Sequence, residues 1–540
     1  MEIQLPEDKD ENENEDDDDD EDDDEHEHEH EFGPTRNPMK SFPSYPRLIL
    51  FLFLYALTFR SVTLVGGNMQ NSIMDMTTAI VERGTTAIDE MHVNSPDVSY
   101  YQGHFYSGMS PGISFLAVPF YAAAKVFWRH APPRLIAIFD RRAENPLDGR
   151  KSKYSIFNTP YYKEQIVAHA LTTLLFGFGA GLVSFYCVCA LAGLLVAGAR
   201  AAKTIGLAFS LATMMVYYNN VYYTQSVALA FVLLGIFLAL VRARGARDLF
   251  LGGLCLALGG VVDYPFFIYA ALVVVAAAAY QFLQWRGYKN ILALGLGFGL
   301  VLGPIMIYHA RVFGSPFHTA INFRYPASEI GGQFFHRFNL PSLKRVKDLL
   351  WSLDEGMLWY SPLCLLFPFG LVECLLRVHR RPAGGARDWR PLILTWLMAA
   401  LIAASIFHFT RVPWSGAGAA YGPRYILSAV PFMTLFAWPF RKFLRLPFFT
   451  LMALWIAIGH LNMIKIPVFT LIHDRWVQGQ WAAVPLRVHL FPYSPNGFSL
   501  GHGLALDLLY QLIVLGLVFG IPWLLGRRRK TSAAAFQSGS

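Results

Sequence analysis

The feature that most constrains this chain is a recurring run of about twenty apolar residues, found along most of its length. A helix of that length crosses the hydrocarbon core of a bilayer and satisfies its own backbone hydrogen bonds there. An apolar content of 54% and a mean hydropathy of +0.34 argue against a soluble globular protein. The sequence therefore predicts an all-α polytopic membrane protein.

Twelve spans are expected, and the charges of their connections set the orientation. The spans are residues 48–66, 165–197, 204–221, 226–241, 249–262, 266–283, 291–310, 357–376, 391–408, 425–440, 447–465 and 506–526. Basic clusters mark the cytoplasmic connections by the positive-inside rule. These clusters are at 200–203, 242–247, 286–289, 377–390, 441–445 and 527–530. Both termini are then cytoplasmic, and residues 112–128 must lie in or dip into the interface, with Pro119 interrupting that helix.

Composition divides the chain into four parts. Residues 1–46 are expected to form a disordered cytoplasmic tail, because residues 1–31 alone hold 20 of the 39 acidic residues. Residues 47–440 form the main transmembrane module, with external loops 67–163, 311–356 and 409–424. Residues 441–526 add further helices around the external loop 466–505, and residues 527–540 form a basic cytoplasmic tail. Outside residues 1–31 the chain carries 44 bases against 19 acids, which suits anionic membrane lipids; no nucleic-acid partner is predicted.

Residues 68–112 are too polar and too aromatic for a simple connection between spans. A long loop that is not disordered is usually functional, so this stretch is expected to carry the function. Its candidate polar side chains are Asp75, Glu82, Asp89, Glu90, His92, Asp97 and His104.

The cysteines give no sign of a disulfide framework or a zinc site. All five lie in apolar segments, and none belongs to a Cys-x-x-Cys pair. The sequence predicts no cofactor and no metal-ligand set, and it leaves open whether a divalent metal takes part.

The loop resembles the first external loop of the type C (GT-C) polytopic glycosyltransferases, which include protein O-mannosyltransferases and aminoarabinose transferases. The motifs in the loop are Asn71-Ser72, Gly84-Thr85-Thr86-Ala87-Ile88-Asp89, Asp97, and Gly103-His104-Phe105-Tyr106-Ser107 with Pro111. Two later stretches add Phe313-Gly314-Ser315-Pro316-Phe317, and Trp414-Ser415-Gly416 with Gly422-Pro423-Arg424-Tyr425. The chain departs from the related bacterial branch at Ile73, where arginine is usual, and at Gly108-Met109, which replaces Asp-Lys.

The resemblance implies a GT-C-like helical bundle with juxtamembrane helices in its first external loop. It implies a bacterial inner-membrane enzyme with its active site on the external, periplasmic side. The implied reaction moves a sugar, with inversion, from a polyprenyl-phosphate donor to a lipid, glycan or protein acceptor. A loop aspartate would take the proton of the acceptor hydroxyl, and cations would stabilise the departing phosphate.

Several residues are candidates for these roles. Asp97 is the first candidate base, with a turn-forming role after Ser95-Pro96 as the alternative. Asp75 is the second, with an exposed helix acid as the alternative. Arg424 is the candidate phosphate ligand, with a snorkelling interfacial arginine as the alternative. The other expected substrate contacts are Tyr425, His104, Tyr106, Trp414, Arg324 and His318.

Two other functions stay open at this point. A transporter or flippase of lipid-linked glycan needs charged residues at mid-span, and the apolar runs hold almost none. A non-catalytic scaffold that keeps the fold is favoured by the departure at Gly108-Met109. A loop aspartate beside Arg424 is the arrangement that distinguishes an enzyme from a scaffold.

Overall fold

The computed structural model divides the chain into two units, Met1–Arg36 and Asn37–Ser540, and every described residue belongs to the second. The described residues are 68–134, 136–137, 140, 159–195, 199–219, 222–284, 287–325, 342–352, 356–379, 388–411, 422–443 and 445–464. The expected acidic tail, the spans 48–66 and 506–526, the loop 466–505 and the basic tail 527–540 lie outside these ranges.

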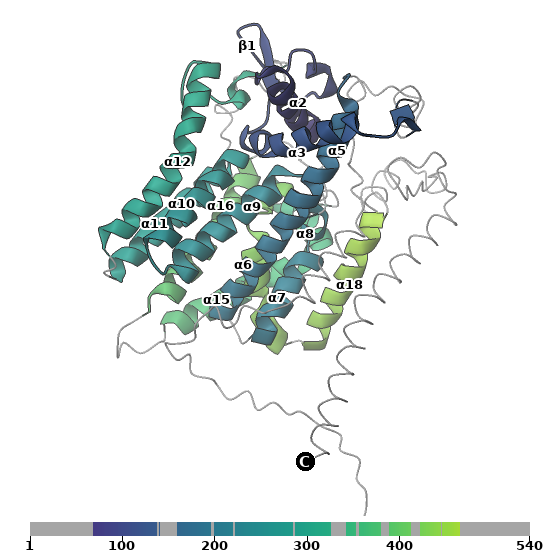
Figure 1. Cartoon of the computed structure of the whole chain (residues 1–540). Coiled ribbons are helices and arrows are strands. Elements are labelled where there is room, and N and C mark those ends of the chain that lie inside the picture. Colours follow the sequence, from purple (N-terminus) through teal and green to yellow (C-terminus); the bar gives the residue numbers. More distant parts are fainter. Residues whose placement is uncertain are drawn as a thin grey trace, which may run out of the picture. The chain divides into compact units, whose positions relative to one another are not determined.

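Helices make up almost all of the described chain (Figure 1). The region before the main bundle contains α2 (Asn68–Arg83), η2 (His92–Asn94), α3 (Gly112–Arg129) and α5 (Tyr162–Thr172). The bundle continues with η4 (Thr173–Phe178), α6 (Gly179–Leu195), α7 (Ala199–Leu211), α8 (Met215–Tyr218), α9 (Thr224–Ile236), η5 (Phe237–Arg242), α10 (Ala246–Val262), α11 (Phe266–Leu283) and α12 (Tyr288–Phe313). It is completed by α13 (Leu343–Trp351), α14 (Met357–Tyr360), η7 (Pro362–Leu366), α15 (Phe367–His379), α16 (Arg390–Arg411), η9 (Arg424–Ile426), α17 (Val430–Ala437), η10 (Trp438–Lys442) and α18 (Arg445–Ile464).

Where the chain is described, the expected spans fall on helical segments, although 204–221 is divided between α7 and α8, and 425–440 between η9, α17 and η10. The count of twelve stays a prediction. The long span 165–197 is α5, η4 and α6 in sequence, and 266–283 is α11 without any shift of boundary. Six described helical segments are long and apolar enough to cross a membrane. They are Leu175–Leu195, Thr224–Arg242, Phe266–Leu283, Tyr288–Phe313, Pro362–His379 and Arg390–Arg411. The prediction of a helical, multi-pass membrane protein is therefore confirmed.

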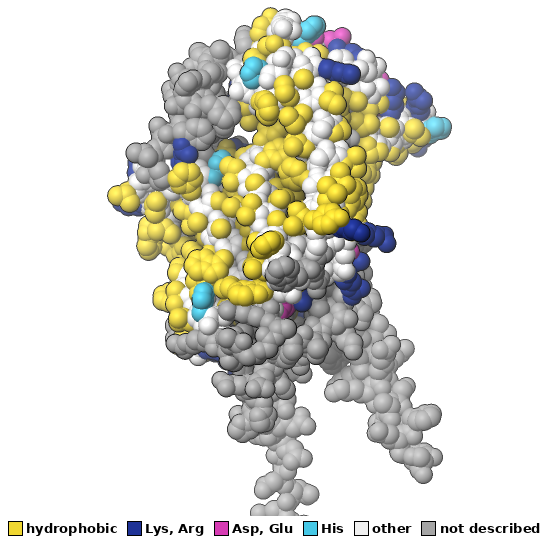
Figure 2. Space-filling model, turned by 90° about the vertical axis from the view of Figure 1, so that its left-hand side faces the viewer, with side chains coloured by type: hydrophobic (Ala, Val, Ile, Leu, Met, Phe, Trp, Pro, Cys, Tyr) yellow, Lys and Arg dark blue, Asp and Glu magenta, His cyan; other side chains and the backbone are white. Residues whose placement is uncertain are grey.

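The outer surfaces of α11 and α12 are those of helices in contact with lipid. Large apolar side chains are exposed along both helices, among them Ile268, Val275, Phe282, Leu292, Leu296, Leu300 and Ile307. Figure 2 views one face of the molecule, where hydrophobic side chains predominate and Lys and Arg lie mostly toward the edges. A soluble protein rarely exposes so much apolar surface, whereas a bilayer covers it.

A close helix pair holds α10 against α12. A Cβ built on Gly253 would lie 2.0 Å from the carbonyl oxygen of Leu294, and one on Gly297 would lie 1.9 Å from that of Phe250. Only glycine leaves room for backbones at this separation, which is how membrane helices pack closely without a hydrophobic driving force. The position of α12 matters for the site, because its carboxyl end leads into the segment that carries Arg324.

The stretch before the bundle folds as three packed helices and a small sheet. In Figure 1, α2, α3, α5 and β1 gather at one end of the helices. The helix expected at 112–128 forms as α3, which packs against α2 and α5. Pro119 does not interrupt it, contrary to the prediction; the helix continues to Arg129, with the proline on its exposed side. α3 is not among the six segments that qualify as spans.

The sheet is an addition to the expected all-helical fold. Strands β1 (Val98–Tyr101) and β2 (His104–Ser107) form a hairpin, and β3 (Arg324–Tyr325) pairs with the other edge of β1. Gln102 and Gly103 form the turn with φ of 50° and 87°, as a two-residue type I′ turn requires. The third strand brings Arg324 opposite Ser99, next to the first loop.

Candidate active site

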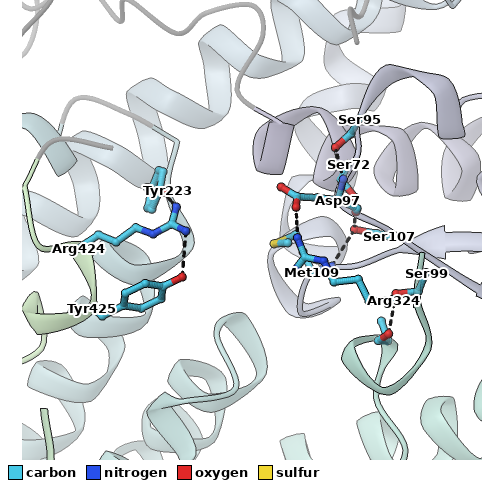
Figure 3. A network of polar contacts seen from close by, with 11 residues as sticks. Ser72, Ser95, Asp97, Ser99, Ser107, Met109, Tyr223, Arg324, Arg424 and Tyr425 are labelled. Carbon is cyan, nitrogen blue, oxygen red and sulfur yellow. Dashed lines mark hydrogen bonds and ion pairs between the residues drawn. The ribbon is translucent and has the colours of Figure 1, made fainter. Parts of the chain in front are cut away.

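The backbone of Asp97 is fixed by hydrogen bonds on both sides of the residue. Its N–H donates to Ser95 Oγ at 3.0 Å. Its carbonyl oxygen accepts from Ser72 Oγ at 2.6 Å and from the N–H of Gly108 at 2.9 Å. Ser72 Oγ also lies 2.8 Å from Ser107 Oγ, so α2 and the end of β2 are joined behind the aspartate (Figure 3). Asp97 is therefore held in one position by α2 and by the residues on either side of the hairpin.

The carboxylate of Asp97 is paired with a cation from a distant segment. Arg324 donates from Nη2 to Asp97 Oδ1, and the two side chains are 22% and 17% exposed for Arg324 and Asp97 respectively. The β3 strand places Arg324, and a 2.6 Å hydrogen bond from Ser99 Oγ to the carbonyl of Ala320 ties the preceding turn to β1. Among the described residues, Asp97 Oδ2 has no hydrogen-bond donor, so one carboxylate oxygen is available to a substrate.

Arg424 is a half-buried cation surrounded by tyrosines. It lies at the start of η9 and donates from Nη1 to Tyr223 and from Nη2 to Tyr425, the latter at 2.9 Å. Its guanidinium carbon lies 4.9 Å from the centre of the Tyr425 ring. Its Nε is buried without a partner, and within the described ranges no carboxylate forms an ion pair with it. A partly buried cation that lacks an anion is a candidate site for an anionic ligand.

Arg424 and Asp97 lie close enough for the charges of both to act on one residue, Tyr223. Burial raises the pKa of Tyr223 against the opposing effect of Arg424, and the charge of Asp97 adds to the rise. In Figure 3 the guanidinium of Arg424 and the carboxylate of Asp97 point toward each other. The sequence analysis expected Asp97 and Arg424 on one face of the membrane, and both belong to the network of polar contacts in Figure 3.

A buried acid, Asp263, lies close enough to Arg424 to be affected by its charge. Asp263, in the turn between α10 and α11, accepts a hydrogen bond from Thr224 Oγ1 at 3.1 Å. Burial raises the pKa of Asp263 to about 7, while the Thr224 hydrogen bond and the charge of Arg424 work in the opposite direction. Near neutral pH this group is poised between its two charge states, and it does not supply a full counter-charge to Arg424.

Asp75 lies in a different environment from Asp97. Its side chain is completely buried in α2, and Oδ1 accepts hydrogen bonds from Asn94 and Gln165, both at 2.9 Å. Burial raises the pKa of Asp75 to about 7 against the effect of these two bonds. The alternative of an exposed helix acid is wrong for Asp75, because α2 is covered by η2 and α5. Full burial also makes Asp97 the better placed candidate base.

The other residues predicted from the loop motifs lie apart from the Asp97–Arg324 pair. His104 is exposed at the hairpin, with Nδ1 2.9 Å from Asp89 Oδ2. Asp89 also accepts from the N–H of Phe105 at 2.6 Å; these two bonds lower its pKa although partial burial opposes them. Tyr106 packs edge-on against Phe313, with ring centres 5.4 Å apart. Asp89 and His104 therefore hold the hairpin in place.

Three further predicted residues, His318, Trp414 and Tyr425, come from the later part of the sequence. His318 is exposed, with Nδ1 3.3 Å from the carbonyl of Phe313 and its ring packed edge-on to Phe323. Trp414 lies outside the described residues. Tyr425 contacts Arg424 directly, as expected of a neighbour in the site.

Sequence reasoning missed Tyr223, Thr224 and the serines that anchor Asp97. Tyr223 lies 201 residues from Arg424, and at the end of a span it has the pattern of an ordinary interfacial aromatic. Ser72 was visible only as part of the Asn71-Ser72 motif. Within the described chain, no three of His, Cys, Asp and Glu come together as a metal site would require.

The fold and these residues define a multi-pass helical membrane protein with a partly buried polar site at one end of its bundle. No protein-family model and no curated protein matches the sequence. The structure is similar to ArnT from Cupriavidus metallidurans bound to undecaprenyl phosphate, with a TM-score of 0.45 and 16% identity over 90% of this chain and 73% of that one. The apo state of the same ArnT gives a TM-score of 0.41 and 14% identity, over 89% and 72%. At these TM-scores and identities the similarity assigns no family.

Proposed function

We propose that the protein transfers a sugar from a polyprenyl-phosphate donor to an acceptor at the external face of the membrane. The observation that carries the proposal is the pairing of two features at one site. Arg424 is a half-buried cation that forms no ion pair with a carboxylate among the described residues, and Asp97 is a fixed, partly exposed carboxylate nearby. The resemblance of the loop motifs to type C glycosyltransferases favours the same chemistry.

In this mechanism the donor phosphate binds between the two arginines. Arg424 offers its unpaired Nε and the positive charge that its tyrosine neighbours do not neutralise. Arg324 offers a second cation. The related branch has a lysine where this chain has Met109, and Figure 3 shows Met109 beside the Asp97–Arg324 pair. We therefore assign to Arg324 the cationic role that the sequence lacks at position 109.

The transfer step is a single displacement with inversion. The acceptor hydroxyl oxygen attacks the anomeric carbon, and Asp97 takes the hydroxyl proton as the new bond forms. The bond between the anomeric carbon and the phosphate oxygen breaks, and its electron pair leaves with the polyprenyl phosphate. Arg424 and Arg324 stabilise the charge that develops on that phosphate. Asp97 releases its proton to solvent after the product leaves.

A transport function finds less support. Among the six candidate spans, charged side chains lie near the ends, apart from Glu373 of α15. Glu373 pairs with Arg377 in the last turn of the same helix, and Lys442 lies 3.8 Å from the same Glu373 oxygen. A path for a charged glycan lipid would instead need charged groups along the middle of several spans.

The test separates binding from transfer in purified protein. Asp97→Asn keeps the shape of the side chain but removes the proton acceptor, so polyprenyl phosphate should still bind while transfer falls by roughly 10²- to 10⁴-fold. Arg424→Ala should weaken polyprenyl-phosphate binding by about 10- to 100-fold, since a charge-assisted hydrogen bond contributes about 1.5–3 kcal/mol. Glu90→Gln is the control, because it removes an exposed loop carboxylate that pairs with Arg83, outside the site.

If Asp97→Asn and Arg424→Ala both bind and transfer as the wild type does, the proposed enzyme mechanism is wrong. If, in addition, the wild-type protein binds no polyprenyl phosphate, the interpretation as a non-catalytic scaffold takes the place of the enzyme interpretation. If Arg424→Ala abolishes binding while Asp97→Asn transfers normally, the phosphate site stands and another group is the base.

A further inference from the structure

Four amide and carboxylate side chains form a buried polar cluster beneath the first loop. Asn71 and Asp75 lie one turn apart on α2, Asn94 ends η2, and Gln165 lies on α5; all four are fully buried. Asp75 Oδ1 accepts from Asn94 Nδ2 and Gln165 Nε2, both at 2.9 Å. Asn71 Nδ2 donates to the carbonyl oxygen of Asn94 at 3.0 Å. The cluster therefore connects three separate segments of the loop region.

Each of the four side chains leaves one oxygen without a partner. These atoms are Asn71 Oδ1, Asp75 Oδ2, Asn94 Oδ1 and Gln165 Oε1, all buried and unbonded within the described part of the chain. The orientation of the amides follows from their partners, because turning any of them over would place an oxygen against a carboxylate or a carbonyl. What is missing is thus a positive charge or a set of donors, and not another acceptor.

This deficit is largest when Asp75 is ionised. Among the described residues no Lys or Arg forms an ion pair with Asp75. A buried carboxylate without a cation, surrounded by further unpaired acceptors, is unfavourable by several kcal/mol in typical cases. Four such atoms in one hydrogen-bonded cluster are more than the occasional exception seen in folded proteins.

We propose that this cluster is a binding site for a hard cation held by oxygen ligands alone. One carboxylate and three amide carbonyls form a ligand set suited to Na⁺ or Ca²⁺, whereas zinc and copper prefer nitrogen or sulfur. Mg²⁺ keeps several waters, for which a fully buried cluster is a poor site. Because Asp75 is the only charge in the cluster, a monovalent ion leaves it neutral, and we expect Na⁺ to be the preferred occupant.

The position of the site suggests what the ion does. Asn71 precedes Ser72, which binds the carbonyl of Asp97, and Asn94 precedes Ser95, which binds the N–H of Asp97. An ion held by Asn71 and Asn94 would fix the two segments that position the candidate base. This second step rests on the proposed function, whereas the binding of the ion does not.

The experiment measures stability, so it is independent of transfer activity. Purified protein is unfolded thermally in choline chloride, NaCl, KCl and CaCl₂ at matched ionic strength. We expect a saturable rise of the midpoint in NaCl or CaCl₂ over choline chloride, and none in Asp75→Asn. Glu90→Gln, which changes an exposed acid of the same loop, should keep the full response. Without the ion, Asp75→Asn should match or exceed wild type, because it removes an uncompensated buried charge.

Gln165→Leu provides a second variant in case Asp75→Asn does not fold. It removes one ligand from α5 and leaves the carboxylate, so it should weaken the response to the ion by about tenfold in concentration. Equal wild-type midpoints in all four salts would overturn the proposal and assign the four oxygens to buried water. A response to the ion combined with absent transfer would overturn the proposed function alone.

Discussion

The contact between α10 and α12 makes a sharp prediction about stability. Gly297→Ala places a methyl group 1.9 Å from the carbonyl oxygen of Phe250, and it also approaches the N–H of Leu254 at 3.0 Å. The neighbour is backbone, so no side chain can rotate away. The helices must separate by roughly 1 Å before the contact reaches even 3.0 Å.

The expected cost follows from comparison with overpacked cores. Forcing a methyl group into a close-packed interface costs about 1–3 kcal/mol, and this contact is with rigid helix backbone. The gain in helix propensity from Gly to Ala is about 1 kcal/mol and works in the opposite direction. A matched control removes that term: Gly295 is on the same helix, and a Cβ there meets nothing within 4 Å.

The assay is thermal unfolding of the two variants in the same detergent at the same scan rate, followed by tryptophan fluorescence and by size-exclusion chromatography. Because both variants carry the same propensity change, the difference between their midpoints reports the contact alone. Gly297→Ala should unfold roughly 1–3 °C below Gly295→Ala, because the unfolding entropy of a chain this long makes each kcal/mol worth only about 1 °C. Equal midpoints for the two variants would refute the close packing of α10 and α12.

Two further predictions concern the candidate site. The pKa of Asp263, raised to about 7 by burial, lies above its value of about 4 in an unfolded chain, so stability should fall as pH rises between these values. Asp263→Asn should make the unfolding midpoint fall less steeply with pH, and Asp75, whose pKa is also raised to about 7, should account for slope that remains. A slope unchanged from wild type would contradict the raised pKa of Asp263. Gly108→Ala brings a Cβ within 2.9 Å of the Asp97 carbonyl oxygen, so transfer should fall by about 3- to 30-fold. The same change in an Asp97→Asn background should cause no further loss, and an additive loss would show that it acts elsewhere.

The spans could be predicted from the sequence because the signal for each is local. A run of apolar residues of membrane-spanning length needs no partner to be recognised, and 266–283 matches α11 at both ends. The hairpin was missed although its signal was present. Gln102-Gly103 lies between the aromatic pairs Tyr100-Tyr101 and Phe105-Tyr106, a pattern that predicts two strands and a tight turn.

The candidate site could be predicted only in its separate parts. Asp97 and Arg424 each lie in a recognisable motif, but the partners that define their environment come from distant segments. Arg324 is 227 residues from Asp97, and Tyr223 is 201 residues from Arg424. Such contacts depend on how α9, α12 and η9 pack, and nothing in the local pattern encodes that. The burial of Asp75 was missed for the same reason, since α2 is covered by a helix that begins at Tyr162.

The change from Asp-Lys to Gly108-Met109 illustrates how a departure in sequence acquires a physical meaning in the fold. The N–H of Gly108 donates to the carbonyl of Asp97 at 2.9 Å, and any side chain at 108 would press on that same backbone. An aspartate could not occupy this position without moving Asp97. Arg324, which β3 brings to the Asp97 carboxylate from another part of the chain, is the residue to which we assign the role of that lysine under the proposed function. Under the proposed function, the absence of a lysine at position 109 therefore does not by itself remove the second cation from the phosphate site.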